Sequence, residues 1–561
     1  MTASSPTSGT PSASNVRGAV AQLYLTLDGQ TPPAELMQAL QEVVVDSSLT
    51  LPDSATVTFR DASIDLIDSD RLKLGAKLEV KAAVQRGGEQ EAIFRGEIVE
   101  VEPQFEGHTQ TLTVRAFDRL HRLARGTQTR SFQNVTDMDL VRKIASELGL
   151  KAEVGEARAV HEYVLQHNQS NLAFLRGRAA RLGFVLYVEG DTLHCHAPKG
   201  EGTLELRWRE NLSSFLPRLS SLDQTSRTTV RGWDPQKKQA VVAQAERGQG
   251  QAQVQDPTRS EQVSQNAFNL PAPETQSGTV VRQQGYADAM AQASRNRRAE
   301  GLVEATGTCG GTPRLTAGTT IKITGVGTRF EGEYVTSSVR HRYRTQQGYM
   351  TEFTISGGRE EGVAAMLGGS STASGAGSGG NTGGDQTGFM IGIVTNNDDP
   401  QGQGRVKVKF PALTEKDESD WARVVSVGGG PTRGVMFTPE VNDEVLVGFE
   451  QGDIHFPYVL GGLWNGSDAP PKAKGEVIKS GRVTKRIIRS RLGHEIILDD
   501  SDGSPSILLK DKSGNEVLID SKANLIKISS KGRVEISAQS GVKIDGGGGN
   551  VDVKGTLINL N

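Results

Sequence analysis

The stretch Ala523–Gly546, "ANLIKISSKGRVEISAQSGVKIDG", places apolar residues at intervals of eight residues. Eight residues hold one short strand, with two side chains on one face, followed by a turn. The tetraglycine Gly546–Gly549 shifts this pattern by one position, after which two valines continue it. The repeat therefore predicts stacked short strands around one apolar core. The residues predicted to line this core are Ile526, Ile528, Val534, Ile536, Val542, Ile544, Val551 and Val553.

The length of the repeat region indicates how many chains form the core. A β-helix built from one chain with three faces needs about 24 residues for each coil, and at least three coils to bury a continuous core. Residues 494–561 supply fewer than three such coils. Three chains wound around one axis avoid this shortage, because each chain then supplies one face. The sequence thus predicts a homotrimeric, triple-stranded β-helix needle over residues 471–561.

The composition of the whole chain favours several domains rich in β structure. The 561 residues exceed the length of one ordinary core, and 66 glycines accompany only 5% aromatic residues. The formal net charge of −3 gives no general reason to expect nucleic acid as a partner. Cys195 and Cys309 form no disulfide framework, and the N-terminus carries no apolar signal segment. We therefore expect the protein to be made in the cytoplasm, without a signal peptide or membrane span.

The stretch Asp398–Pro411, "DDPQGQGRVKVKFP", raises the question of a phosphate-binding glycine loop. Such a loop needs a helix behind it, so that unpaired backbone N–H groups point at the anion. Here the glycines lead into alternating basic and apolar residues, which are typical of a half-buried strand. We interpret the glycines as part of the first hairpin of a five-stranded OB-type barrel over residues 389–470.

The residues before the barrel predict an α+β hub in two parts. Its clearest helix is "TDMDLVRKIASELGL", in which Thr136 caps the start and Gly149 ends the apolar stripe. The expected fold is therefore mainly β, with an α+β hub, an OB-type barrel and a trimeric needle. The predicted order before the barrel is a disordered leader (1–16), the hub (17–235 and 284–362) interrupted by an extended excursion (236–283), and a Gly/Ser linker (363–388).

Three blocks of the sequence resemble one known family. "DPQGQGRVKV", "WARV", "PEVNDEVLVGF" and "PYVLGGLWN" look like that family's oligonucleotide/oligosaccharide-binding (OB) barrel, and "SRLGHEIILDDSDG" is similar to the start of its triple-stranded needle. "VRAFDRLHRLARGTQTRSFQNVTDMDLVRKIASELGL" looks like a phage late-control hub. The chain thus resembles the spikes of contractile injection machines. These are the VgrG family of type VI secretion, the spikes of extracellular injection systems, and the fused hub and needle proteins of contractile phages.

The resemblance implies a mechanical function. Three hub pairs would form a pseudo-sixfold ring on the hexameric inner tube, with baseplate components and effector cargo as further partners. Sheath contraction would drive the needle through a target membrane and deliver the particle outside the cell. This chain has no lysozyme domain after the barrel and no iron-binding His-x-His tip after His494, so we expect a separate tip protein of PAAR type. The residues predicted to dock it are Leu557, Ile558, Asn559, Leu560 and Asn561.

Three segments contain residues that could bind a metal ion or a phosphate. "HCH" at residues 194–196 places two imidazoles on one face of a strand, but strand histidines are usually structural, and we expect no metal there. "DDSDG" at residues 499–503 lacks the ligand pattern of a calcium loop and is expected to be a solvated turn. The basic run "GRVTKRIIRSR" at residues 481–491 could meet phosphates, although acidic residues from neighbouring chains are the favoured partners.

No catalytic motif stands in the sequence, and we expect neither enzymatic activity nor a cofactor. Two alternatives remain open at this point. A cell-wall hydrolase would need a hub cleft with paired carboxylates of perturbed pKa. A carbohydrate or nucleic-acid binder would need aromatic residues on the open face of the barrel, where "RVKVKF" offers mainly Arg and Lys.

Overall fold

A computed structural model gives the fold of the chain. It describes residues 22–559 except 84–88, 108, 235, 250–251, 257, 278, 356–387 and 415. The predicted leader and almost all of the predicted Gly/Ser linker lie outside the described residues. The chain divides into two compact units, Met1–Gly462 and Leu463–Asn561, which we describe in turn. None of the described helices is long and apolar enough to cross a membrane.

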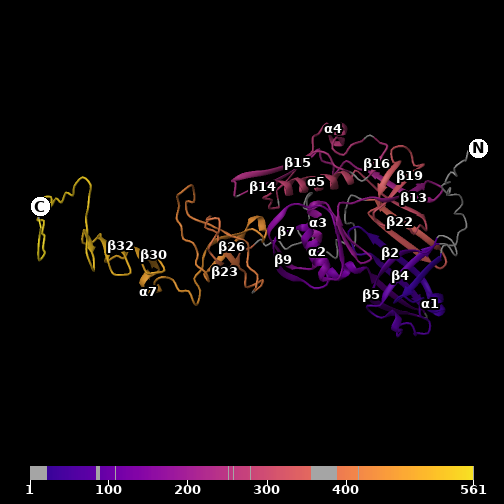
Figure 1. Ribbon diagram of the computed structural model, residues 1–561, viewed down its shortest axis with the longest axis horizontal. Coiled ribbons are helices and arrows are strands. Elements are labelled where there is room, and N and C mark those ends of the chain that lie inside the picture. The colour runs from indigo at the N-terminus through magenta and orange to yellow at the C-terminus, as the bar shows by residue number, and fades with distance from the viewer. Residues whose placement is uncertain are drawn as a thin grey trace, which may run out of the picture. The chain divides into compact units, whose positions relative to one another are not determined.

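A ten-stranded sheet forms the main body of the hub (Figure 1). Its strands alternate inward and outward side chains, as in β3, where Ala55, Val57 and Phe59 are buried. Helix α1 (Ala34–Ala39) follows the first strand. The strands, in spatial order, are β1 (Gln22–Leu27), β4 (Lys77–Ala83), β5 (Glu91–Glu106), β6 (Thr109–Phe117), β3 (Ser54–Arg60), β2 (Leu40–Ser48), β21 (Ser338–Arg344), β22 (Gly348–Ile355), β18 (Val303–Gly310) and β13 (Leu212–Leu219).

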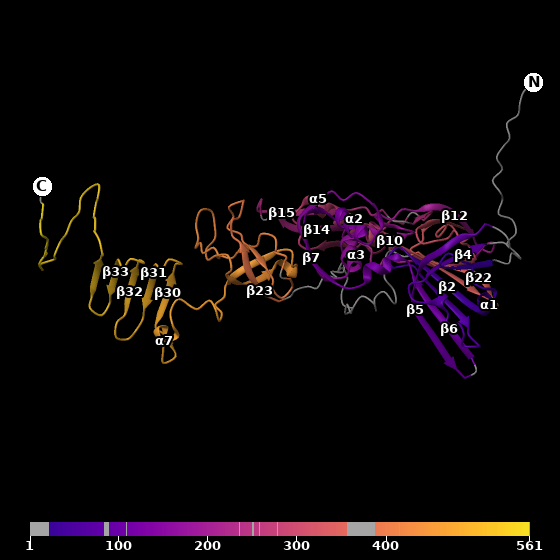
Figure 2. The same ribbon diagram turned by 60° about the horizontal axis from the view of Figure 1, so that its bottom comes forward.

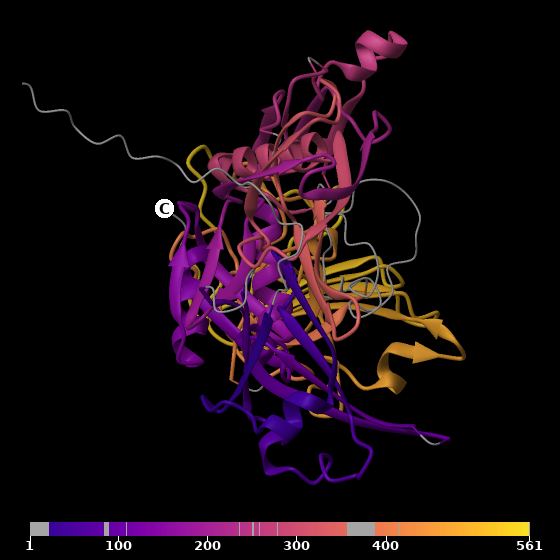
Figure 3. The same cartoon turned by 90° about the vertical axis from the view of Figure 1, so that its right-hand side faces the viewer.

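The two predicted parts of the hub belong to this one sheet. Strands β2 and β21 pair antiparallel, with Val43 opposite Tyr343 and Val45 opposite His341. Beyond that junction the second part has its own core, which includes Ile321. The β5–β6 hairpin projects from the sheet (Figures 2 and 3). A four-stranded sheet combines strands from both hub parts and from the segment 236–283, in the order β12 (Glu201–Arg207), β19 (Thr319–Thr324), β20 (Gly332–Val335) and β16 (Gln253–Val254).

An α+β layer lies between these β regions in the sequence. Thr136 Oγ1 accepts from the N–H of Asp139 and begins helix α2, and Gly149 follows its end with a φ of 69°, which confirms both predicted boundaries. Apolar residues of both helices pack in one core with those of the small sheets. The elements are β7 (Gln128–Thr136) paired with β9 (Val160–Gln169), the sheet of β10 (Val185–Glu189), β11 (Thr192–His196) and β8 (Lys151–Val154), and helices α2 (Asp137–Glu147) and α3 (Asn171–Leu182).

The segment 236–283 carries more regular structure than the extended excursion that we predicted. Helix α5 (Gln284–Glu300) packs on strands β14 and β15, burying Ala287 and Ala291 with Val230 and Val241 (Figure 1). The segment's polar, weakly periodic sequence concealed strand β15 because only one face of that strand is buried. Its elements are β15 (Gln239–Ala245) and β17 (Pro273–Gln276), which flank β14 (Arg227–Asp234), together with strand β16 and helix α4 (Val263–Phe268).

The barrel region has the predicted five strands. Gly402 and Gly404 have φ angles of 64° and 70° in the connection from β23 to β24, which confirms that they belong to a hairpin. Asp399 accepts hydrogen bonds from three backbone N–H groups of this connection, and the Arg405 guanidinium holds the pKa of Asp399 far below its usual range. The strands are β23 (Met390–Asn396), β24 (Lys407–Lys409), β25 (Arg423–Val424), β26 (Glu444–Phe449) and β27 (Pro457–Gly462).

The barrel contacts the α+β layer of the hub through polar groups. The N–H and Oγ of Ser131 donate to Asp417 Oδ1 at 3.3 and 2.8 Å. The Arg282 guanidinium bonds Glu450 Oε2 at 3.1 Å and lies 4.0 Å from the centre of the Phe456 ring. These contacts join the hub to the barrel within the first unit.

The second unit contains a meander of five antiparallel strands in chain order (Figure 2). No strand is assigned to the described residues 530–559, which include most of the eight-residue repeat. The elements are α7 (Lys474–Val477), the hairpin of β28 (Ile478–Lys479) and β29 (Arg482–Val483), and the meander of β30 (Lys485–Arg489), β31 (Glu495–Asp499), β32 (Ser506–Lys510), β33 (Glu516–Asp520) and β34 (Leu525–Ser529).

Two carboxyl groups meet where β3 begins and β6 ends. Asp53 Oδ1 accepts from the N–H of Ser48, and the carboxylate of Asp118 accepts from the N–H groups of Asp53 and Leu120. Burial raises the pKa of Asp53 from 3.8 to about 7, and burial together with the neighbouring Asp53 raises the pKa of Asp118 well above its ordinary value. The folded hub thus retains protons that the unfolded chain releases.

This proton uptake predicts a pH-dependent hub stability. The contribution of Asp53 to the free energy of unfolding should fall as the pH rises from about 4 to about 7, because the folded state binds more protons there. Asp53→Asn retains an acceptor for Ser48 and removes the charge, so it should stabilise the hub at pH 8 by about 1–3 kcal/mol. Calorimetric unfolding of the full chain at several pH values measures this difference.

The exposed Asp68→Asn provides the control, and its pH profile should match that of the unmodified chain. A stabilisation by Asp53→Asn that is equal at pH 5 and pH 8 would contradict the assigned pKa shift.

Candidate functional site

One face of the needle meander consists almost entirely of apolar side chains. The strand register aligns them in two adjacent rows, in which Ile496 lies opposite Leu509 and Leu498 lies opposite Ile507. Residues two apart on a strand share a face, so both rows lie on the same side of the sheet. We call this surface the apolar needle face. Its residues are Ile488, Ile496, Leu509, Val517 and Ile528 in one row and Leu498, Ile507, Ile519 and Ile526 in the other.

The opposite face of the meander has a different composition. Its central apolar row, which includes Ile497, is flanked by charged residues that pair across the strands. Lys485 Nζ lies 3.3 Å from Asp499 Oδ2, and Arg489 Nη1 lies 3.5 Å from Glu495 Oε1. The basic run of residues 481–491 therefore forms ion pairs with acidic residues of its own chain. The sequence-based prediction favours acidic residues of neighbouring chains instead.

The apolar needle face is exposed in the single chain. Exposed fractions reach 69% for Ile526 and 64% for Ile528, and even Ile519 in the middle of the meander remains 37% exposed. Large contiguous apolar surfaces of this kind mark sites of association. The residues of the eight-residue repeat beyond the meander, Val534, Ile536, Val542, Ile544, Val551 and Val553, are between 52% and 71% exposed.

The structure therefore brings only part of the predicted core together. Ile526 and Ile528 lie on strand β34 and belong to the apolar needle face, whereas the other six follow where no strand is assigned. The eight-residue spacing does not predict the upstream residues of the apolar needle face, such as Ile507 and Leu509, because their hairpins do not share that spacing. The short apolar runs in "EIILDD" and "SILLKD" were the available signal for strands.

The predicted docking residues for a tip protein lie at the C-terminal end of the second unit. Leu557 and Ile558 are 76% and 49% exposed, and Asn559 is exposed as well. Leu560 and Asn561 lie outside the described residues. The site remains a prediction.

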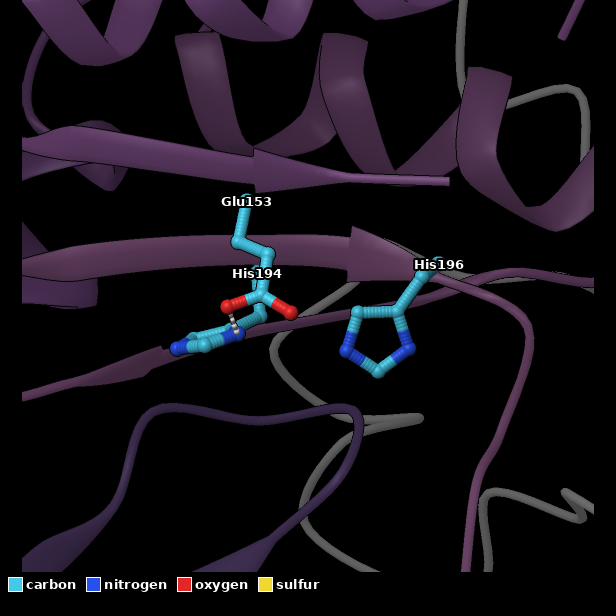
Figure 4. Close-up of side chains that lie close together, drawn as sticks. All are labelled: Glu153, His194 and His196. Atoms are coloured by element: carbon cyan, nitrogen blue, oxygen red, sulfur yellow. Dashed lines mark ion pairs between the residues drawn. The ribbon is translucent and has the colours of Figure 1, made fainter. Parts of the chain in front are cut away.

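The segments "DDSDG" and "HCH", both candidates for metal binding, have different surroundings in the structure. Asp499 accepts from the N–H of Ser501 in a turn, as expected for "DDSDG". His194 and His196, however, are joined by Glu153 in one cluster of possible metal ligands (Figure 4). Glu153 lies about 40 residues upstream in the sequence, and only the parallel pairing of β8 with β11 places it there. Cys195 points to the core on the other face, where burial raises the pKa of its thiol to about 12.

Comparisons with known proteins match two regions of the chain to family models. Residues 19–345 match the family model described as the Alg8 N-terminal domain, and residues 390–464 match the type VI secretion system/phage-baseplate injector OB domain. The spike protein VgrG3 of Vibrio cholerae is 30% identical over 149 residues, which cover 24% of this chain and 14% of that protein. VgrG5 of Pseudomonas aeruginosa is 38% identical over 92 residues, which cover 16% of this chain and 12% of that protein.

Solved structures share the fold over most of the chain. A chain of the lidded Francisella PdpA–VgrG complex superposes with a TM-score of 0.53 at 9% identity, covering 91% of this chain and 81% of that one. A chain of the lidless PdpA–VgrG complex gives 0.52 at 8% identity, covering 92% and 100%. The alignments to the curated spikes span about one seventh of those proteins or less. Since the Alg8 N-terminal domain model covers more than half of the sequence, the chain belongs to the Alg8 N-terminal domain family.

Proposed function

We propose that three copies of this chain form the structural spike of a contractile injection machine. The observation that carries the proposal is the apolar needle face, which a single chain leaves in contact with water. Three such faces turned toward a common axis would bury one another, and the charged opposite faces would remain in water. The repeat residues Val534 to Val553 would continue the same axis as a triple-stranded β-helix toward the tip.

The hub is proposed to join the spike to the inner tube. The ten-stranded sheet contains two β regions per chain with separate cores, so three chains would present six β regions around the axis. That number matches a hexameric tube. Baseplate components are the expected neighbours of this ring. The solved PdpA–VgrG complexes support a further proposal, that this spike also carries a cargo protein.

The proposed function is mechanical and involves no catalysis. Asp53 and Asp118 form an acidic pair with raised pKa values, as a hydrolase would need, but their carboxylates already accept hydrogen bonds from backbone N–H groups. These groups stabilise a turn and the start of a short helix, which is a structural role. The spike is assembled in the cytoplasm and reaches the target membrane only when the machine fires.

The trimer proposal predicts that lysine substitutions at two neighbouring residues affect the stability of the needle differently. Ile507→Lys places a charge on the apolar needle face, so three lysines would meet in a dry core and destabilise the needle by several kcal/mol per trimer. Ser506→Lys places the same side chain on the opposite face, between Asp499 and Asp520, and should be tolerated. Light scattering and thermal unfolding of the full chain measure the two outcomes.

Val534→Asp tests the repeat in the same way and should also weaken the trimer. A chain that is monomeric at micromolar concentration, or an Ile507→Lys variant as stable and as trimeric as Ser506→Lys, would refute the axial assignment.

A second prediction concerns the tip. Deleting residues 557–561 should abolish binding of a PAAR-type tip protein, because the exposed apolar Leu557 and Ile558 belong to the proposed docking surface. Trimerisation should survive, since the apolar needle face is unchanged. Co-purification with the tip protein is the measurement, and undiminished recovery with the truncated spike would locate docking elsewhere.

A further inference from the structure

The hub contains a cluster of three side chains that the mechanical function does not use. His194 and His196 lie on the same face of β11, and Glu153 lies directly opposite His194 on the parallel strand β8. Their potential ligand atoms all lie within 4.8 Å of one another. Figure 4 shows the carboxylate of Glu153 beside the His194 ring, with a nitrogen of His196 directed toward the same space.

His194 has an unused nitrogen in this cluster. Its side chain is about nine-tenths buried, yet Nδ1 has no hydrogen-bond partner among the described residues. Glu153 Oε2 lies 3.6 Å from this nitrogen, which is too long for a hydrogen bond. A buried polar atom without a partner carries a cost in free energy. A cation between Glu153 and His194 would satisfy this nitrogen and the carboxylate together.

The second histidine is held in the orientation that a metal ligand needs. His196 Nδ1 lies 2.8 Å from the carbonyl oxygen of Ala197, so Nδ1 carries the proton and Nε2 keeps its lone pair. The Tyr187 hydroxyl makes only a long contact of 3.4 Å to Nε2. The His194 ring is fixed by parallel stacking on Tyr187, with ring centres 4.8 Å apart. Such outer contacts are typical of the histidines that bind metals.

We propose that Glu153, His194 and His196 bind one divalent transition-metal ion, with Zn²⁺ as the preferred occupant. Two imidazole nitrogens and one carboxylate form a ligand set that suits Zn²⁺ and disfavours Ca²⁺ and Mg²⁺, which prefer oxygen ligands. Zinc distances of about 2.0–2.2 Å place tetrahedral ligands about 3.3 Å apart, so small side-chain rotations close the site. The Glu153 side chain is 62% exposed, which leaves a route for the ion and room for water as fourth ligand.

The bound ion would cross-link two strands of the hub. Strands β8 and β11 are the parallel pair of their sheet, and their pairing spans only four residues on each strand. The ion would connect side chains from both strands and close the chain segment that contains helix α3. Its role is to stabilise the α+β layer against which the barrel packs.

The experiment titrates the untagged full chain, after treatment with a chelator, with Zn²⁺ by calorimetry and with Co²⁺ by visible absorption. We expect one ion for each chain, a Co²⁺ spectrum with the intensity of tetrahedral coordination, and a rise in the hub's unfolding temperature with Zn²⁺. Glu153→Gln should weaken Zn²⁺ binding at least tenfold and His196→Gln at least a hundredfold. Mg²⁺ should not compete.

Two controls separate the site from general surface binding. Lys151→Gln changes an exposed residue of the same strand, and His494→Gln removes an exposed histidine of the needle, so both should bind Zn²⁺ as the unmodified chain does. Glu153 is exposed enough that its variant should fold, and near-ultraviolet circular dichroism checks this. The proposal is overturned if the chain binds no stoichiometric Zn²⁺, or if Glu153→Gln and His196→Gln bind it as tightly as the controls.

Discussion

The apolar needle face is the constraint on which the architecture depends. Nine apolar side chains lie in two rows on one side of a five-stranded sheet, and eight of them are between 37% and 69% exposed in the single chain. A single exposed leucine needs no explanation, but a whole sheet face does. In the proposed trimer, association of identical chains would cover the face without requiring any further domain. The charged pairs on the opposite side would favour contact of that side with water, so the apolar side would turn inward.

The hub differs from the needle because its hydrophobic cores are buried within one chain. Pairing of β2 with β21 brings residues about 300 positions apart into one sheet, so the two hub parts cannot separate without breaking that sheet. The barrel adds to this body through the Ser131–Asp417 and Arg282–Glu450 contacts. Force applied to the hub therefore passes through paired strands and charged contacts. Such an arrangement would suit the proposed function, in which the hub must stay intact during contraction.

The sequence predicted the local structure well and the long-range contacts less well. The cap of α2 at Thr136 and the hairpin glycines Gly402 and Gly404 were predictable because backbone geometry restricts which residues those positions accept. The strands of segment 239–276 were missed because their polar composition hides a buried face that only α5 defines. Glu153 was missed for a related reason. Glu153 lies beside His194 and His196 only because strands β8 and β11 pair in parallel, and no local sequence pattern predicts that pairing.

The barrel shows why a glycine-rich loop need not bind a ligand. A phosphate-binding loop works because its N–H groups lack partners and point at the anion. In the β23–β24 connection those groups are already used, since the carboxylate of Asp399 accepts from the N–H groups of Gln401, Gln403 and Arg405. The Arg405 guanidinium then neutralises that carboxylate, and the depressed pKa of Asp399 keeps the pair ionised. Asp399 thus occupies the position that a phosphate would take, and the loop acts as a rigid part of the scaffold.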